Sequence, residues 1–177
     1  MDISKATYYT VAEMGDLDDL LEKMRSEHKS ISDIVDIQDT QGISLLQHSL
    51  IGRKFGIANF LLDNNARINV VTKMKYNELH FVSSGIHTHG AVNIAKRLIS
   101  KGVDLNLQDI KYQNTAFQCL LLDVLKQRTV DSMELILFCL KRKPDIHSVN
   151  KAGISAMDII KERGDAEMKK MIKDIIV

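Results

Sequence analysis

A short phrase recurs four times along the 177-residue chain, and its spacing constrains the fold more than any other feature of the sequence. Each copy holds an apolar residue, a polar residue, two further residues and a closing Asx or threonine; the copies are 35–39, 68–72, 105–109 and 146–150. The closing residues are separated by 33, 37 and 41 positions. A period of about 20–50 residues is typical of repeat architectures. The sequence therefore predicts an array of similar units, the later two with insertions.

The segments between these phrases have helical patterns. Ser44 precedes the short apolar stretch 45–51, where its hydroxyl is expected to cap a helix by accepting from the first free backbone amides. A second helix is expected over Ile57–Leu62, where apolar residues lie at helical spacing, and Asn64 and Asn65 should end it because asparagine tolerates left-handed geometry. Each unit is thus a turn, a short helix, a tight bend and a second helix. One such unit cannot bury its own apolar face, so neighbouring units must stack.

These segments resemble the ankyrin repeat, whose pattern has a D-x-x-G-x-T-P-L-H turn and a closing G-A-D-V-N stretch. The most similar stretch runs from Asp39 to Asn69, and the later units keep Asn77–His80, Thr115–Gln118 and Asn150–Asp158. Two features depart from the pattern: its proline is replaced by Leu45, Glu78, Ala116 and Ala156, and its first-turn glycine remains only as Gly42 and Gly153, with Lys75 and a shifted Tyr112-Gln113 in the middle units.

The resemblance implies an all-α solenoid of helix-turn-helix units joined by short β-turn or hairpin connections. We expect an N-terminal helical cap over 1–36, repeats over 37–69, 70–106 and 107–147, and a C-terminal capping repeat over 148–177. The insertions should lengthen the bends between helices, at Ser83–Gly90 in the second repeat and at Lys126–Asp131 in the third. Long connections in a compact repeat are often functional, although drift in a tolerant loop accounts for them nearly as well.

The charge balance and the cysteine positions narrow the kinds of function that the chain can have. Lysine and arginine number 24 against 23 aspartate and glutamate, which leaves no net field to attract nucleic acid or an anionic membrane. Cys119 and Cys139 lie inside apolar runs without metal-type spacing, which is typical of buried free thiols in a reducing compartment. Without a signal-peptide pattern or an apolar span, the chain is expected to be cytoplasmic, and we expect a monomer.

The sequence contains no recognisable catalytic or cofactor-binding motif. The chain has no G-x-S-x-G sequence, and its Gly52–Gly56 segment lacks the spacing of a phosphate-binding loop. The alternative to a chain without a chemical site is a metal site at His80, His87 and His89. However, His80 occupies the family's structural histidine position, and its side chain is expected to point away from the insertion. No cysteine or acidic residue close in sequence completes a set of four ligands. We therefore expect no catalytic residue, no cofactor and no metal.

Binding through the turns is the better-supported hypothesis. In a stack of this kind, each turn projects residues from equivalent positions along one concave surface. The expected contact residues are Thr40, Gln41, Ile43, Lys73, Met74, Tyr76, Ile110, Lys111, Tyr112, Asn114 and Lys151. Exposed tyrosines are enriched in interfaces, although these two could instead lie against adjacent turns. The hypothesis is a protein–protein interaction module that uses its central repeats; the alternative is an immunity-type inhibitor that neutralises an enzyme or toxin.

Overall fold

The computed structural model describes residues 2–176, with side chains through residue 173, so that Met1 and Val177, the ends of the expected cap and last repeat, lie outside it. The described part is all-α, as expected, with eleven helices and no strand. Helices α1, α2 and α3 form the N-terminal part: Tyr8–Met14, Leu17–Ser26 and Ile31–Ile34. Four helix pairs follow: α4 Leu45–Ile51 and α5 Phe55–Asp63, α6 Glu78–Ser83 and α7 Ala91–Ser100, α8 Ala116–Gln127 and α9 Val130–Leu140, and α10 Ala156–Arg163 and α11 Ala166–Ile176.

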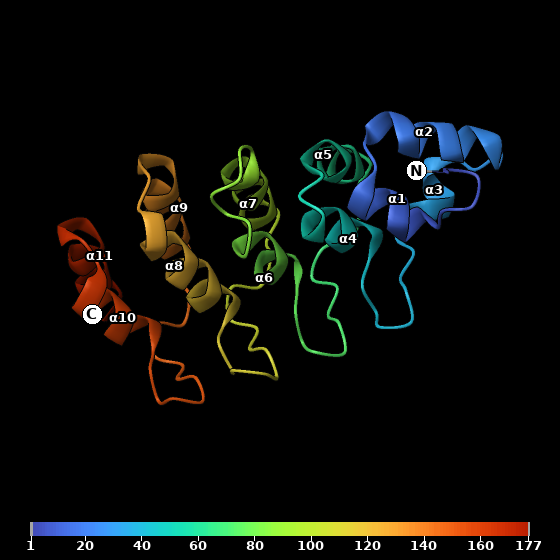
Figure 1. Ribbon diagram of the computed structural model, residues 1–177. Helices are drawn as coiled ribbons and strands as arrows, with labels where there is room; N and C mark the ends of the chain where they lie inside the picture. The colour runs from blue at the N-terminus through green and yellow to red at the C-terminus, as the bar shows by residue number, and fades with distance from the viewer. Residues whose placement is uncertain (1, 177) are drawn as a thin grey trace.

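The helix pairs stand side by side in chain order, with the two termini at opposite ends of the stack (Figure 1). The first helices of successive units pack against one another, from α1 on α4 through α6 to α8 and α10. The second helices form a parallel row, from α2 and α5 through α7 to α9 and α11. The buried residues make one apolar cluster from Val11 to Ile172, so the core continues through the whole stack. Each unit buries its apolar faces only because it has neighbours.

The same capping arrangement begins the first helix of every pair. The side chain of the N-cap residue accepts from the backbone N–H three residues on, and the side chain of that third residue returns to the N-cap backbone. The pairs are Ser44 with Gln47, Asn77 with His80, Thr115 with Gln118, and Ser155 with Asp158. The expected cap at Ser44 is confirmed. The expected stop after α5 is confirmed too, since Asn65 has a φ of 59°.

The loops between units project to one side of the stack (Figure 1). Their tips are joined by backbone hydrogen bonds from Lys73 N to the Gln41 carbonyl (3.1 Å), from Ile110 N to the Met74 carbonyl (3.1 Å) and from Lys151 N to the Tyr112 carbonyl (2.9 Å). The left-handed turn position, filled by Gly42 and Gly153 in the outer loops, is filled by Lys75 (φ 58°) and Gln113 (φ 56°) in the middle ones. Each of these two residues adopts a backbone conformation that glycine would adopt at less steric cost.

The insertion in the third unit does not lengthen a bend, so the expectation for Lys126–Asp131 is wrong. Helix α8 instead runs for 12 residues, against 7 in α4 and 6 in α6, and only Arg128 and Thr129 separate it from α9. Its buried residues Leu121, Val124 and Leu125 extend the apolar stripe by a further turn, so the added residues are more stable as helix. The longer bend of the second unit is as expected, at Ser84–Gly90 between α6 and α7.

No helix in the described part of the chain is both long and apolar enough to cross a membrane.

Gly52 lets the N-terminal part approach the first helix pair. A Cβ atom at this position would lie 1.9 Å from the backbone oxygen of Glu13 on α1. We expect Gly52→Ala to lower the free energy of unfolding by about 3 kcal/mol, because backbone must move to admit the methyl group. Gly56→Ala is the matched control: it lies in α5 with nothing within 4 Å of its Cβ position, and should raise stability by up to about 1 kcal/mol. Urea unfolding of both variants measures the difference, and equal stabilities would contradict the close packing of α1 on α4.

Candidate functional site

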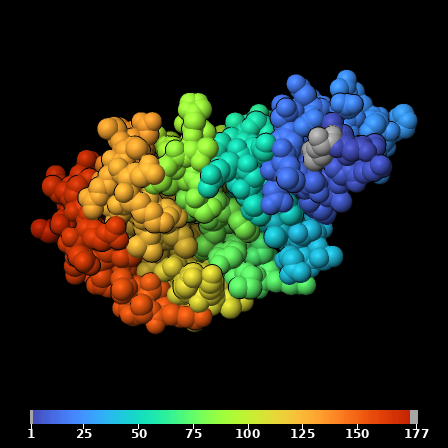
Figure 2. All heavy atoms as spheres, viewed as in Figure 1, coloured from blue at the N-terminus to red at the C-terminus, as the bar shows by residue number. Residues whose placement is uncertain are grey.

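The expected contact residues all lie on the loops, which the stack brings to one side of the molecule (Figure 1). Exposed among them are Thr40, Gln41, Lys73, Met74, Ile110, Lys111, Tyr112 and Lys151, and half-buried are Ile43, Tyr76 and Asn114. In the space-filling view, the loops of successive units touch along the lower edge (Figure 2). We call this row of loops, residues 38–44, 71–77, 108–115 and 149–155, the tip surface. Because backbone hydrogen bonds join its neighbouring tips, their spacing is set before any partner arrives.

Apolar side chains recur along the tip surface. Six large ones are exposed by 43–55%: Val71, Met74, Ile110, Tyr112, Val149 and Ile154. Ile154 is not among the expected contact residues, although it occupies the same position in its loop as Ile43 and Tyr76. A row of exposed apolar groups has no role in the core of the stack, and such rows are typical of interaction surfaces.

The tip surface is basic although the whole chain is almost neutral. Lys73, Lys75, Lys111 and Lys151 are exposed on it. Two carboxylates in the same loops turn inward to hold the turns: Asp39 accepts from Gln41 N and Ile43 N, and the buried Asp109 accepts from Tyr112 N and Asn114 N. Lys111 Nζ lies 4.8 Å from the centre of the Tyr112 ring, where a cation–π contact holds it beside the aromatic group.

A pocket of about 300 Å³ opens between α6 and α8, and both tyrosines of the expected contact set line it. Its walls are Tyr76, His80, Phe81, Ser84, Asp109, Tyr112, Cys119 and Asp123. The two tyrosines differ in environment. Tyr76 is half-buried, with its ring centre 5.3 Å from that of His80 and 5.8 Å from that of Phe81, whereas Tyr112 is exposed. Tyr76 therefore packs on its own unit as well as facing the pocket.

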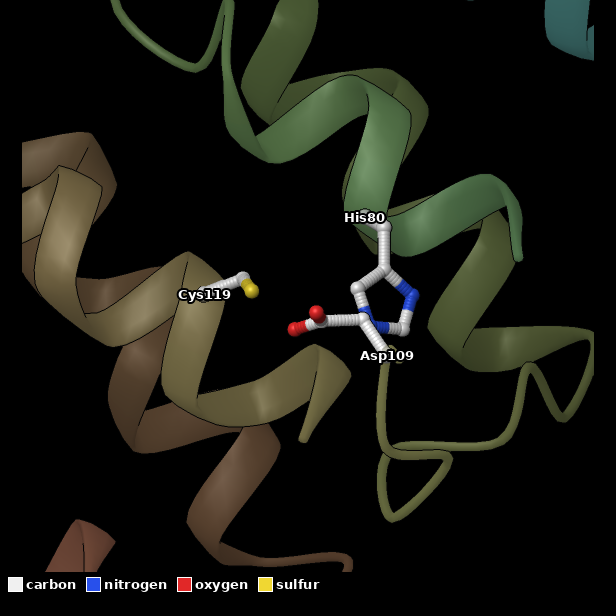
Figure 3. Close-up of side chains that lie close together, drawn as sticks. All are labelled: His80, Asp109 and Cys119. Carbon is white, nitrogen blue, oxygen red and sulfur yellow. The ribbon is translucent and has the colours of Figure 1, made fainter. Parts of the chain in front are cut away.

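A histidine, an aspartate and a cysteine from two neighbouring units lie close together in the lining of this pocket. The ligand atoms of His80 on α6, Asp109 in the following loop and Cys119 on α8 all lie within 4.8 Å of one another (Figure 3). Burial lowers the pKa of His80 and raises the pKa of the Cys119 thiol to about 12. Sequence reasoning missed this cluster because its members are far apart along the chain, and no local spacing signals it.

The other two histidines of the metal hypothesis lie elsewhere. His87 and His89 line a separate pocket with Thr129 and Asp131, and His87 Nε2 lies 2.8 Å from the backbone carbonyl oxygen of Asp123. His80 instead lines the pocket between α6 and α8. His80, His87 and His89 do not bring their ring nitrogens together.

A buried carboxylate fixes the loop that carries Met74 and Tyr76. Glu78, at the position where the resemblance implies proline, is fully buried and accepts hydrogen bonds from Asn69 N (2.9 Å), Val70 N (3.1 Å) and Gln47 Nε2 (3.0 Å). Burial raises the pKa of Glu78, and these donors offset part of the shift. The residue therefore stabilises the start of the loop and its contact with the preceding unit.

No model of a protein family matches the chain, and no curated protein matches it. Among solved structures, the chain is similar to a functionally unknown protein from Leptotrichia buccalis, with a TM-score of 0.71 and 19% sequence identity over 96% of this chain and 92% of that one. In all, 407 chains match in fold. At this level of identity the similarity concerns the fold alone, and a shared fold does not specify a function.

Glu78→Ala should lower the free energy of unfolding by about 2–4 kcal/mol, because it leaves two backbone N–H groups and one of the two Gln47 amide N–H groups without their acceptor. Glu162→Ala, an exposed position on α10, should change stability by less than about 0.5 kcal/mol. Chemical unfolding measures the free energy of unfolding of both variants. A loss at Glu78 no larger than that at Glu162 would show that the carboxylate does not hold the loop.

Proposed function

We propose that the chain is an ankyrin-type repeat protein that binds another protein through its tip surface and the pocket between α6 and α8. One observation carries the proposal: exposed apolar side chains recur on three successive loops, and the two tyrosines of the central loops meet at a single pocket. Helix formation and core packing do not require this arrangement.

The ankyrin assignment is supported by features that repeat from unit to unit. Each helix pair begins with the same capping arrangement, at the positions where the family has T-P-L-H. Between the pairs lie loops with hairpin-like bridges, Gln38 to Ser44, Gln108 to Thr115 and Val149 to Ser155. The left-handed residue in each of the four loops stands at or next to the position of the family's first-turn glycine.

Binding of a protein suits the physical character of the tip surface. Hot spots in protein interfaces are commonly aromatic residues near the centre of a contact, inserted into or bordering a pocket. Tyr112 has this character, since it is exposed, borders the pocket and belongs to a loop held on both sides by hydrogen bonds to its neighbours. A surface so held loses little conformational entropy on binding, which favours affinity.

The charge of the tip surface indicates what the partner offers. Four exposed lysines stand among apolar side chains, while the nearby carboxylates are used inside the loops. A partner surface of acidic residues around apolar ones would complement this pattern, and opposite charges would speed association at low salt. The partner we propose is therefore an acidic protein surface with at least one apolar or aromatic side chain that enters the pocket.

An inhibitor of an enzyme or toxin would use the same tip surface, because blocking an acidic site requires the same rigid row of basic and apolar side chains. The two roles differ in their consequence for the partner. An inhibitor abolishes the partner's activity on binding, and an adaptor leaves it intact. Assaying the captured partner with and without this protein separates them.

A photoreactive amino acid at Ile110, exposed on the tip surface, should crosslink the partner in cells of the source organism. The matched control carries the same amino acid at Glu134, exposed on the outer helix α9. We expect one protein to be crosslinked from Ile110 and not from Glu134, identified by mass spectrometry. Equal crosslinking from both positions would contradict a specific tip surface.

With the partner purified, Tyr112→Ala should weaken its binding by about 30-fold, the size of a loss of about 2 kcal/mol at a hot spot. The control is Val130→Ala, which removes an exposed apolar side chain from the start of α9 (75% exposed) and should change affinity less than about twofold. Tyr112 is preferable to Tyr76, whose packing on His80 and Phe81 couples its removal to stability. Calorimetric titration measures both variants, and equal affinities would exclude the tyrosine as an anchor.

A further inference from the structure

We propose that His80, Asp109 and Cys119 form a zinc site in the pocket between α6 and α8. The three side chains offer one nitrogen, one oxygen and one sulfur ligand, all within 4.8 Å of one another (Figure 3). Zinc binds this mixed donor set in tetrahedral geometry, and sites with three protein ligands keep the fourth position for water or another group. Asp123 also lines this pocket.

The imidazole of His80 gives independent support. The residue is 92% buried, since 8% of its surface is exposed, yet its Nε2 has no hydrogen-bond partner. The backbone carbonyl of Asn114 lies near enough to raise the pKa of His80, but it already accepts the Asp109 N–H and forms no hydrogen bond of normal geometry with Nε2. An unpaired buried polar atom is destabilising, and a metal ion at Nε2 would give it a partner.

Asn77 can bond the other nitrogen of the same ring in either neutral tautomer. In the capping arrangement, His80 Nδ1 accepts the Asn77 backbone N–H (3.2 Å), and the ring proton is on Nε2. Metal binding at Nε2 requires the other tautomer, in which the proton is on Nδ1 and is donated to Asn77 Oδ1, 2.9 Å away. A hydrogen bond of this kind from the second ring nitrogen orients most zinc-binding histidines. Burial also lowers the pKa of His80, so that the ring is neutral and able to bind metal at neutral pH.

Asp109 and Cys119 have capacity for a metal without giving up their structural roles. Each Asp109 carboxylate oxygen accepts one backbone N–H, which leaves a further lone pair on each oxygen. Cys119 lies one turn into the long helix α8 and is a free thiol. Zinc–sulfur and zinc–nitrogen bonds of about 2.3 and 2.0 Å place the two ligand atoms roughly 3.5 Å apart. Side-chain rotations that move the ligand atoms by about 1 Å would therefore bring them to bonding distance of one ion.

Binding exchanges one proton for one metal ion. Burial raises the pKa of Cys119 to about 12, so the thiol is protonated at neutral pH without metal. The zinc–sulfur bond forms as the sulfur–hydrogen bond breaks, and the proton passes to the buffer. The thiol proton is the one that the metal displaces, so about one proton is released per ion. The affinity should therefore rise about tenfold for each pH unit between pH 7 and 8.

Cobalt(II) titration of the reduced, metal-free full chain tests the site, because a thiolate ligand gives an intense charge-transfer band and tetrahedral cobalt a distinct visible spectrum. We expect one equivalent to produce both, and zinc to displace the cobalt. Cys119→Ala should abolish the charge-transfer band and weaken zinc binding at least tenfold, while circular dichroism shows that the variant remains folded.

Two variants are matched controls: Cys139→Ala removes the other, buried thiol on α9, and His87→Ala removes a histidine of the separate pocket. Both should keep the band and the affinity. The proposal is overturned if the wild type gives no band, if the band survives Cys119→Ala, or if either control abolishes it. Calorimetry in buffers of different ionisation enthalpy counts the protons, and zero release would also exclude a thiolate ligand. None of these readouts depends on the protein partner.

Discussion

Hydrogen bonds from buried amide side chains of one unit to the loop of the next hold the tip surface in place. Gln47 donates to the Val70 carbonyl at 2.6 Å, and Gln118 donates to the Ile154 carbonyl at 3.0 Å, in each case a loop of the following unit. Both residues also close the capping arrangement at the start of their own helix. A single side chain thus begins a helix and fixes the next loop, so helix start and loop position cannot shift independently. Where the second unit has His80 instead, Asn77 donates to the Asp104 carbonyl.

The candidate site depends on this coupling because its parts come from different units. Tyr76 and Tyr112 belong to neighbouring loops, and the pocket between them exists only when α6 and α8 are packed side by side. The middle loops also carry Lys75 and Gln113 in left-handed conformation, where the outer loops have glycine. These residues keep their unfavourable geometry because backbone hydrogen bonds join the tips of neighbouring loops, and in the 108–115 loop the Asp109 carboxylate also accepts two backbone N–H groups. The exposed apolar and basic side chains of the middle loops therefore lie beside two of the chain's left-handed non-glycine residues.

Local patterns predicted well whatever depends on neighbours in sequence. A hydroxyl at Ser44 and paired asparagines at Asn64 and Asn65 marked a helix start and a helix end, because capping and left-handed geometry are properties of a few residues. The length of α8 was not predictable in this way. The same apolar residues suit a loop over the core or an extra helical turn, and only the space beside α9 selects the helix. Ile154 was missed as a contact residue because exposure is set by packing: Ile43 and Tyr76, at the same position in their loops, are half-buried, whereas Ile154 is 43% exposed.

The sequence by itself determined that the chain is helical, that it repeats, and that its successive turns carry Tyr76, Tyr112 and the lysines. Periodicity and spacing suffice for these conclusions, because they concern the order of residues along one chain. Only the tertiary structure decided which distant residues meet. It brought His80, Asp109 and Cys119 together and separated them from His87 and His89. The physical reason is stacking: each unit places its own side chains against those of its neighbour, and the distance along the chain between them carries no information about that contact.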